Sequence, residues 1–331
     1  MKKEHVLNAD LVADIRGHAQ EAELRGTLSA AEWELVHQQN WLNLYLPADM
    51  KGMGLALPDA LLKLEQLAAV DASLGWTVTL CSGAHWFLGF LEKDLRSALF
   101  IKDRLCIAGS GDAGGTAVPL DGGYWVEGSW PHATGAGNAT HFSANLCLKG
   151  DMAAFLFYAD EVELFSNWTT MGMKATASHG FRVRPQWIPA NRFFRINPSA
   201  YTHPDPVFRC PFELLAAYTL AVNTSGMASR FAELAGVQLS LPETEFYQER
   251  NRLLENARRH WQTLQAGNQV SPTEVQESSR QARQLTALVL RFVQDLYAGM
   301  GLRAAREEQE INRVWRNLHT AALHPLLRKL S

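Results

Sequence analysis

Histidines near the end of the chain are the first residues with chemistry to offer. His319 and His324 lie five positions apart, and His85 lies much earlier, in an apolar segment beside Trp86. An imidazole with a pKa of about 6.5 can donate or accept a proton near neutral pH. A spacing of five does not place two side chains well on one helix face. These histidines are therefore either separate candidates for acid–base catalysis or residues with a structural role, which is the simpler interpretation for His85.

A glycine-rich stretch, Gly109–Ala117, and the segment after it, Gly123–Gly135, form the second candidate. Glycine and alanine make up most of the first stretch, so its backbone can pass close to a flat ligand. Hydroxyl and backbone N–H groups beside a tryptophan suit an isoalloxazine ring, which has one polar and one apolar edge. The alternative is a glycine-rich β-turn that binds nothing.

The composition excludes several classes of function. The 331 residues carry 31 basic and 34 acidic side chains, a net charge of −3 that offers no electrostatic footprint for nucleic acid or an anionic membrane. The cysteines Cys81, Cys106, Cys147 and Cys210 are far apart, so we expect neither a zinc site nor a disulfide framework. The sequence shows no signal peptide and no apolar run of membrane-spanning length, which predicts a cytoplasmic protein with no membrane partner.

Three regions that differ in the spacing of their apolar residues must position these candidates. Apolar residues recur at helical spacing up to about residue 105, and Ser29–Glu32 and Ser271–Glu274 read as capping boxes that begin helices. Short alternating runs between Gly109 and Ile196 indicate strands, after which helices resume. The pattern predicts an α+β multidomain chain. Its parts are an N-terminal helical domain (1–107), a central antiparallel β domain (108–200) and a C-terminal helical bundle (201–331).

Several segments resemble the acyl-CoA dehydrogenase superfamily of flavoproteins. Gly123–Gly135 is similar to the family's flavin-facing stretch, Trp168–His179 to its Gly-Met-Arg-Gly-Thr-Gly-Ser motif, and Leu67–Trp76 to its Ala-x-x-Asp-x-Ser-x-Gly-Trp motif. The resemblance implies the acyl-CoA dehydrogenase-like fold, with Trp130 flanking a flavin ring and Thr134 hydrogen-bonding near flavin N5. The cofactor-binding residues it predicts are Gly114, Thr116, Trp130, Thr134, Gly135, Lys174 and Thr176.

The chain departs from the family at three places. His132 stands where a phenylalanine is usual, and Lys174 stands where an arginine is usual. Lysine keeps the charge but cannot offer two parallel donors to a phosphate or substrate. The run after Arg230 lacks the arginine motif with which the family holds the FAD pyrophosphate, which favours FMN over FAD or points to lost flavin binding.

The last helix separates the branches of the superfamily. Ile311–Pro325 resembles the corresponding stretch of two-component flavin-dependent monooxygenases, whereas acyl-CoA dehydrogenases carry there a glutamate that abstracts an α-proton. Pro325 offers no base at that place, and His324 is the nearest functional group. The resemblance thus implies that His324 stabilises a flavin-bound peroxide or moves a proton. The predicted catalytic residues are His324, His319 and His85.

We therefore expect a monooxygenase component that uses reduced FMN, or alternatively FAD, delivered by a flavin reductase. Its substrate is expected to be a small aromatic, heteroaromatic or sulfur-containing molecule, and the resemblance implies a homo-oligomer, a dimer or tetramer. One alternative is an FAD-dependent acyl-CoA dehydrogenase with a displaced base. Another is a non-catalytic protein that retained the fold.

Overall fold

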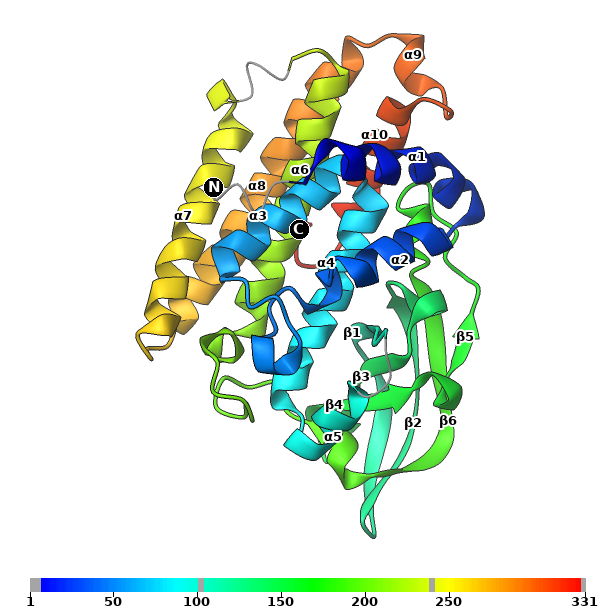
Figure 1. The fold of residues 1–331 in the computed structure, drawn as a ribbon, viewed down its shortest axis with the longest axis vertical. Coiled ribbons are helices and arrows are strands. Elements are labelled where there is room, and N and C mark those ends of the chain that lie inside the picture. Colours follow the sequence, from blue (N-terminus) through cyan, green and yellow to red (C-terminus); the bar gives the residue numbers. More distant parts are fainter. Residues whose placement is uncertain (1–6, 101–103, 238–241, 329–331) are drawn as a thin grey trace.

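The computed structural model describes residues 7–100, 104–237 and 242–328. Helices make up the first third of the chain, as the apolar spacing predicts (Figure 1). They are α1 (Ala9–Arg25), α2 (Ala30–Gln38), α3 (Leu57–Val70), α4 (Ala72–His85) and α5 (Lys93–Leu99). The capping box at the start of α2 is confirmed: Ser29 Oγ accepts the Glu32 N–H, and the Glu32 carboxylate accepts the Ser29 N–H.

Within the described residues, seven strands form one sheet in the order β5-β6-β2-β1-β3-β4-β7. The strands are β1 (Ile107–Leu120), β2 (Gly123–Ala133), β3 (His141–Leu148), β4 (Asp151–Tyr158), β5 (Glu163–Phe165), β6 (His179–Pro189) and β7 (Phe193–Phe194). The expected antiparallel sheet is in fact mixed, because β1 pairs with β3 in parallel. The glycine-rich stretch is part of the long strand β1 rather than a turn, and the turn to β2 lies at Asp121-Gly122, where Gly122 has a φ of +71°.

Long helices resume after the sheet. They are α6 (Phe212–Leu234), α7 (Glu245–Gln265), α8 (Pro272–Ala298), the short α9 (Leu302–Ala305) and α10 (Glu310–Ala321). The second capping box, Ser271 with Glu274 at the start of α8, is also confirmed. Helix α6 lies at the centre of the helical part, since it packs against α3, α4, α8 and α10. Arg230 of α6 forms a two-pronged ion pair with Glu310 in the first turn of α10, at 2.7 and 2.8 Å.

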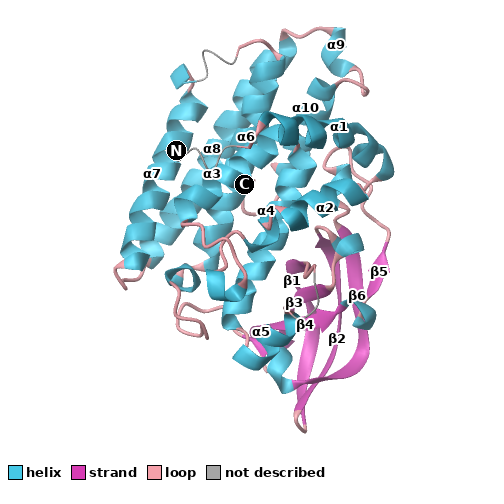
Figure 2. Ribbon diagram, viewed as in Figure 1, coloured by secondary structure: helices cyan, strands magenta, loops and turns pink. Residues whose placement is uncertain are grey.

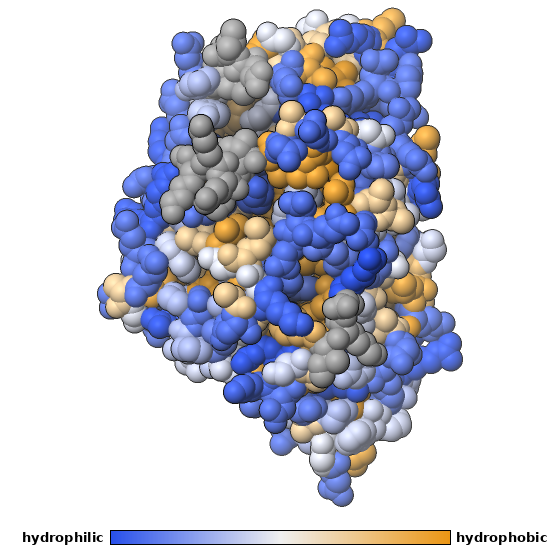
Figure 3. Space-filling model, viewed as in Figure 1, coloured by the Kyte–Doolittle hydropathy of each residue, from blue (hydrophilic) through white to orange (hydrophobic). Residues whose placement is uncertain are grey.

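The helical part and the sheet lie side by side, with α4 between α6 and β1 (Figure 2). One apolar core runs through the helical part, and a second lies within the sheet domain. Figure 3 shows hydrophilic side chains over most of the face that it presents, with apolar residues visible between them. Among the described residues, no helix has the length and apolar character needed to cross a lipid bilayer.

Candidate active site

Trp130 fills the space that the glycines of β1 and β2 leave open. A Cβ atom at Gly114 would lie 2.6 Å from Trp130 Cδ1, and one at Gly128 would lie 2.4 Å from Trp130 Cη2. The indole is fully buried, stacks on Phe181 with ring centroids 5.0 Å apart, and donates from Nε1 to the Asn145 carbonyl at 3.2 Å. The flat group beside these glycines is therefore an indole of the chain itself. The structure does not support a flavin slot at Gly114 or Trp130 as a residue that flanks the ring.

The strand is irregular after Trp130, and this changes which side chains reach the surface. Its register with β6 shifts between Trp130 and Ala133. His132 is consequently exposed, and its ring meets Trp168 edge-on with centroids 5.5 Å apart. Thr116 is exposed too, but it pairs with Glu127 far from this end of β2, so the structure does not bring it together with the other predicted residues.

Three buried hydroxyl groups gather where β2 ends and β6 begins. Thr134 Oγ1 lies 2.8 Å from Ser178 Oγ, which lies 2.7 Å from Thr176 Oγ1. Thr176 Oγ1 in turn donates to the Met173 carbonyl at 2.8 Å, and the Gly135 N–H donates to the Thr176 carbonyl at 2.9 Å. The structure thus brings Thr134, Gly135 and Thr176 together and adds Ser178; their predicted role in cofactor binding stays a prediction.

The loop between β5 and β6 carries two of these hydroxyls, those of Thr176 and Ser178, and rests on α10. The Met173 N–H donates to Asn317 Oδ1 at 2.6 Å, and Arg316 donates to the Met171 carbonyl at 2.6 Å. A Cβ at Gly172 would lie 2.2 Å from the Arg316 carbonyl oxygen, so only glycine permits this close approach of the two backbones. Lys174 is partly buried in the same loop; its carbonyl accepts the Ala177 N–H at 3.3 Å, and its ammonium has no hydrogen-bond or ion-pair partner among the described residues.

Helix α4 packs against both this loop and His324 near the C-terminus. Asp71 begins the helix by accepting the Leu74 N–H at 2.8 Å, and one turn on, Thr77 and Cys81 lie against Gly135. The Thr77 hydroxyl is buried without a hydrogen-bond partner among the described residues. Trp76, next to Thr77, meets the His324 ring edge-on at 5.9 Å. His324 and the hydroxyl cluster therefore adjoin the same part of α4.

The His324 ring is neutral at physiological pH. Burial lowers its pKa to about 4, although the Asp112 carboxylate of β1 raises it somewhat. Its Nδ1 accepts the Leu326 N–H at 3.2 Å, so in the neutral ring the proton lies on Nε2. His324 can consequently donate a hydrogen bond from Nε2 to a group bound beside Trp76.

His319 has a different setting. Its ring stacks on Trp315 with centroids 3.9 Å apart, and Trp315 stacks on Tyr297 at 5.0 Å. Nδ1 lies 2.8 Å from the Trp315 carbonyl oxygen, which can only accept, so Nδ1 carries the proton. Burial lowers the pKa of His319, and its Nε2 keeps a lone pair.

His85 lies in the core of the molecule, away from any surface. Nδ1 donates to Asn43 Oδ1 at 2.8 Å, and Nε2 accepts the Ile107 N–H at 3.2 Å. Complete burial lowers its pKa to about 3, so the ring stays neutral and joins the helical part to β1. Both ring nitrogens are occupied, and the structure gives the predicted catalytic role of His85 no support.

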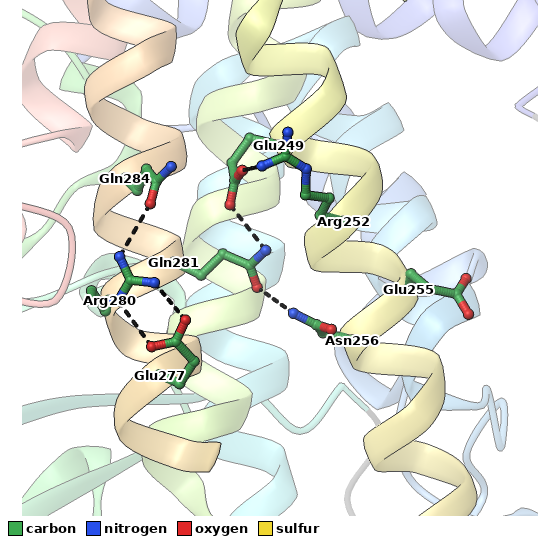
Figure 4. A pocket seen from close by; sticks show the side chains of 8 residues that line it. All are labelled: Glu249, Arg252, Glu255, Asn256, Glu277, Arg280, Gln281 and Gln284. Atoms are coloured by element: carbon green, nitrogen blue, oxygen red, sulfur yellow. Dashed lines mark hydrogen bonds and ion pairs between the residues drawn. The ribbon is translucent and has the colours of Figure 1, made fainter. Parts of the chain in front are cut away.

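Open cavities lie elsewhere on the molecule. A polar groove of about 410 Å³ runs between α7 and α8, where Arg280 pairs with Glu277 and Arg252 with Glu249 (Figure 4). A second cavity of similar volume lies beside α2 and includes His37. Neither contains a residue predicted for the flavin site. The charges in the groove largely pair with each other, which indicates a solvated surface between two helices.

Three residues of the candidate site were not in the predicted set. Ser178 occupies the serine position of the motif at Trp168–His179, so the resemblance already held a signal for it. Asn317 and Arg316 lie in the C-terminal motif, but their partners are backbone groups of a loop more than 140 residues earlier, which no local pattern reveals.

Several known proteins with a similar sequence are named flavin-dependent monooxygenases or hydroxylases, and one is named a putative acyl-CoA dehydrogenase. The oxygenase subunit HsaA of Mycobacterium tuberculosis is 23% identical over 296 residues, which cover 78% of this chain and 75% of the relative. The oxygenase component of an FADH2-dependent resorcinol hydroxylase from Rhizobium is 24% identical over 189 residues, covering 55% of this chain and 46% of the relative.

Solved structures show that the fold is shared. The crystal structure of M. tuberculosis HsaA superimposes with a TM-score of 0.87 at 21% identity, covering 96% of this chain and 92% of that one. Dibenzothiophene monooxygenase TdsC from Paenibacillus superimposes with a TM-score of 0.76 at 20% identity, covering 95% and 91%.

Two family models also match the sequence. The acyl-CoA dehydrogenase N-terminal domain matches residues 9–90, and the acyl-CoA dehydrogenase C-terminal domain matches residues 223–329. Together the two matches take in more than half of the chain, which therefore belongs to the acyl-CoA dehydrogenase family.

Proposed function

We propose that this chain is the oxygenase component of a two-component flavin-dependent monooxygenase. It takes reduced FMN from a separate reductase and oxidises a small aromatic, heteroaromatic or sulfur-containing substrate. The names of the relatives support this proposal, since HsaA is an oxygenase subunit and the resorcinol hydroxylase is an oxygenase component. An oxygenase component implies a partner that reduces the flavin.

The residues present fit a flavin in three respects. The hydroxyl of Thr134 offers an oxygen for the polar region around flavin N5. The exposed ring of His132 and the partly buried ring of Trp168 together offer an aromatic surface, which the buried Trp130 does not. The ammonium of Lys174, which has no partner among the described residues, suits a phosphate group. Arg230 is occupied by Glu310, which leaves no pyrophosphate anchor there and favours FMN over FAD.

When bound, a reduced flavin supplies the activation of oxygen. The chain's own contribution begins with Thr134 and Lys174, which hold the cofactor. His324 presents Nε2–H as a donor to an oxygen atom, and Trp76 keeps that ring in place and shields it from water. No carboxylate base follows His324, since the next residue is Pro325. This arrangement supports oxygen transfer over the α-proton abstraction of a dehydrogenase.

The observation that carries the proposal is the position of His324, a neutral imidazole beside α4 whose Nε2–H has no hydrogen-bond partner among the described residues. The first experiment is an anaerobic titration of the purified protein with FMN and FAD, each oxidised and reduced. We expect reduced FMN to bind most tightly. A preparation that is yellow as purified and binds acyl-CoA would support a dehydrogenase instead, and a protein that binds no flavin would refute the proposal.

The second experiment tests His324 itself. With reduced FMN, oxygen and the substrates of relatives as probes (resorcinol, dibenzothiophene and methanesulfinate), wild type should convert part of the oxygen into product. His324→Ala should bind reduced FMN as wild type does, but its ratio of hydrogen peroxide to product should be about tenfold higher, since one hydrogen bond is worth about 1.4 kcal/mol. His18→Gln, on the surface of α1, is the matched control. Equal peroxide yields in all three proteins would contradict the role of His324.

We also propose that the chain works as a homo-oligomer, a dimer or tetramer that associates through the C-terminal helices. Leu302 is 86% exposed and Phe212 is 37% exposed in the single chain, so apolar side chains remain for such a contact. Light scattering on the purified protein tests this directly, and a monomer at micromolar concentration would refute it.

A further inference from the structure

The hydrogen-bonded hydroxyls at the candidate site have only one possible order of protons. A carbonyl oxygen has no proton to give, so at 2.8 Å from the Met173 carbonyl the Thr176 hydroxyl must be the donor. A hydroxyl carries a single proton, and the Thr176 hydroxyl donates its proton to the Met173 carbonyl. The 2.7 Å contact between Ser178 and Thr176 therefore requires Ser178 to donate, and the 2.8 Å contact between Thr134 and Ser178 requires Thr134 to donate.

Burial prevents water from changing this order. Thr176 is 1% exposed and Ser178 is 4% exposed, so neither hydroxyl has solvent available as an alternative partner. Thr134, at the end of the series, is the most exposed of the three at 8%. Its proton is directed inward to Ser178, so toward any ligand its oxygen offers lone pairs alone.

We propose that Thr176 and Ser178 hold the Thr134 hydroxyl as an acceptor and that the site thereby selects the reduced flavin over the oxidised one. This inference rests on the proposed function. Flavin N5 carries a hydrogen in the reduced state and a lone pair in the oxidised state. A Thr134 oxygen that can only accept forms a hydrogen bond with the N5–H of the reduced flavin and repels the N5 lone pair of the oxidised flavin. Ser178 is thus a positioning residue, since it acts on the ligand through Thr134.

The proposal predicts a preference that can be measured as a ratio of two dissociation constants. Wild type should bind reduced FMN about tenfold more tightly than oxidised FMN, from one hydrogen bond gained or lost. By linkage, the midpoint potential of bound FMN should lie about 30 mV above that of free FMN, because a tenfold ratio in a two-electron couple corresponds to this shift. Neither measurement depends on turnover.

Ser178→Ala removes the acceptor for the Thr134 proton, which can then turn toward the ligand and donate to oxidised N5. The ratio should fall to about one, with oxidised FMN bound at least as tightly as in wild type. Thr176→Val should also lower the ratio. Without the Thr176 acceptor, Ser178 can donate its proton to Thr134, and the Thr134 hydroxyl can then donate to the ligand. Thr176→Ser keeps every hydroxyl and should keep the wild-type ratio. Ser278→Ala, which removes a buried hydroxyl from α8, is the control for loss of a buried hydroxyl elsewhere.

The outcomes separate this inference from the proposed function. If wild type binds neither flavin, the proposed function fails. If wild type binds both redox states equally, or if Ser178→Ala weakens both by the same factor, the inference fails and the proposed function stands. Circular dichroism of each variant shows whether it is folded, and the Thr176 pair still decides the matter if Ser178→Ala does not fold.

Discussion

Replacing Gly128 with alanine puts a methyl group into the space that the Trp130 indole fills. The new Cβ would lie 2.4 Å from Trp130 Cη2, 2.7 Å from Gly115 Cα and 2.8 Å from the Gly114 carbonyl oxygen. Two of these three atoms belong to the backbone of β1 and cannot rotate away, and the indole is fully buried. Overpacking of a core costs about 1–3 kcal/mol, and contacts this short place the expected loss of unfolding free energy near 3 kcal/mol.

Urea denaturation followed by circular dichroism measures this loss. Gly111→Ala is the matched control, since it adds the same methyl group to β1 at a position with no atom within 4 Å, and it should change the free energy by less than about 0.5 kcal/mol. In a Gly128→Ala, Trp130→Phe double variant the smaller ring should make room, so the two losses should not add. If Gly128→Ala unfolds at the same urea concentration as Gly111→Ala, the packing of Trp130 on the glycines is refuted.

Three further substitutions test the loop and the core. Ala177 has a left-handed φ of +44°, so Ala177→Gly should be nearly neutral and Ala177→Val should cost at least about 2 kcal/mol in a urea titration; equal stability of the two would contradict the strained backbone. Asn317→Ala leaves the buried Met173 N–H without its acceptor and should cost about 1–3 kcal/mol, whereas Asn317→Asp keeps an acceptor and should cost less. His85 has a folded pKa of about 3, so between pH 7 and pH 5 only the unfolded chain takes up its proton, and stability should fall by about 2 kcal/mol. His85→Gln, which does not titrate, should lose this part of the pH dependence, and an unchanged slope would show that His85 is not its source.

Local patterns predicted the elements better than the contacts between them. Ser29 and Glu32 lie three positions apart, so the geometry of one helix turn decides their bonds, and the predicted capping box is present. The pairing of β1 with β3 is parallel, and no turn between consecutive strands encodes it. The sequence predicts an antiparallel sheet, and only the structure reveals the parallel pair.

The predicted flavin slot is a second case in which contacts between distant residues could not be predicted from local sequence. The glycines at 114 and 115 lie some fifteen positions before Trp130, and only the register of β1 with β2 places the indole over them. Both a bound ring and a packed indole require such glycines, so composition alone cannot distinguish them. His85 is comparable, since its partners Asn43 and Ile107 lie 42 and 22 positions away.

The backbone also decides what each C-terminal histidine can do, which the residue type leaves open. Nδ1 of His319 faces the carbonyl oxygen of Trp315 and must carry a proton, whereas Nδ1 of His324 faces the N–H of Leu326 and must carry a lone pair. Burial lowers the pKa of both rings, so both are neutral at pH 7 with opposite tautomers. Nε2 is therefore a proton acceptor in His319 and a hydrogen-bond donor in His324. A role for His324 as a general base would first require the loss of its bond to Leu326, so we assign it the stabilisation of an oxygen atom.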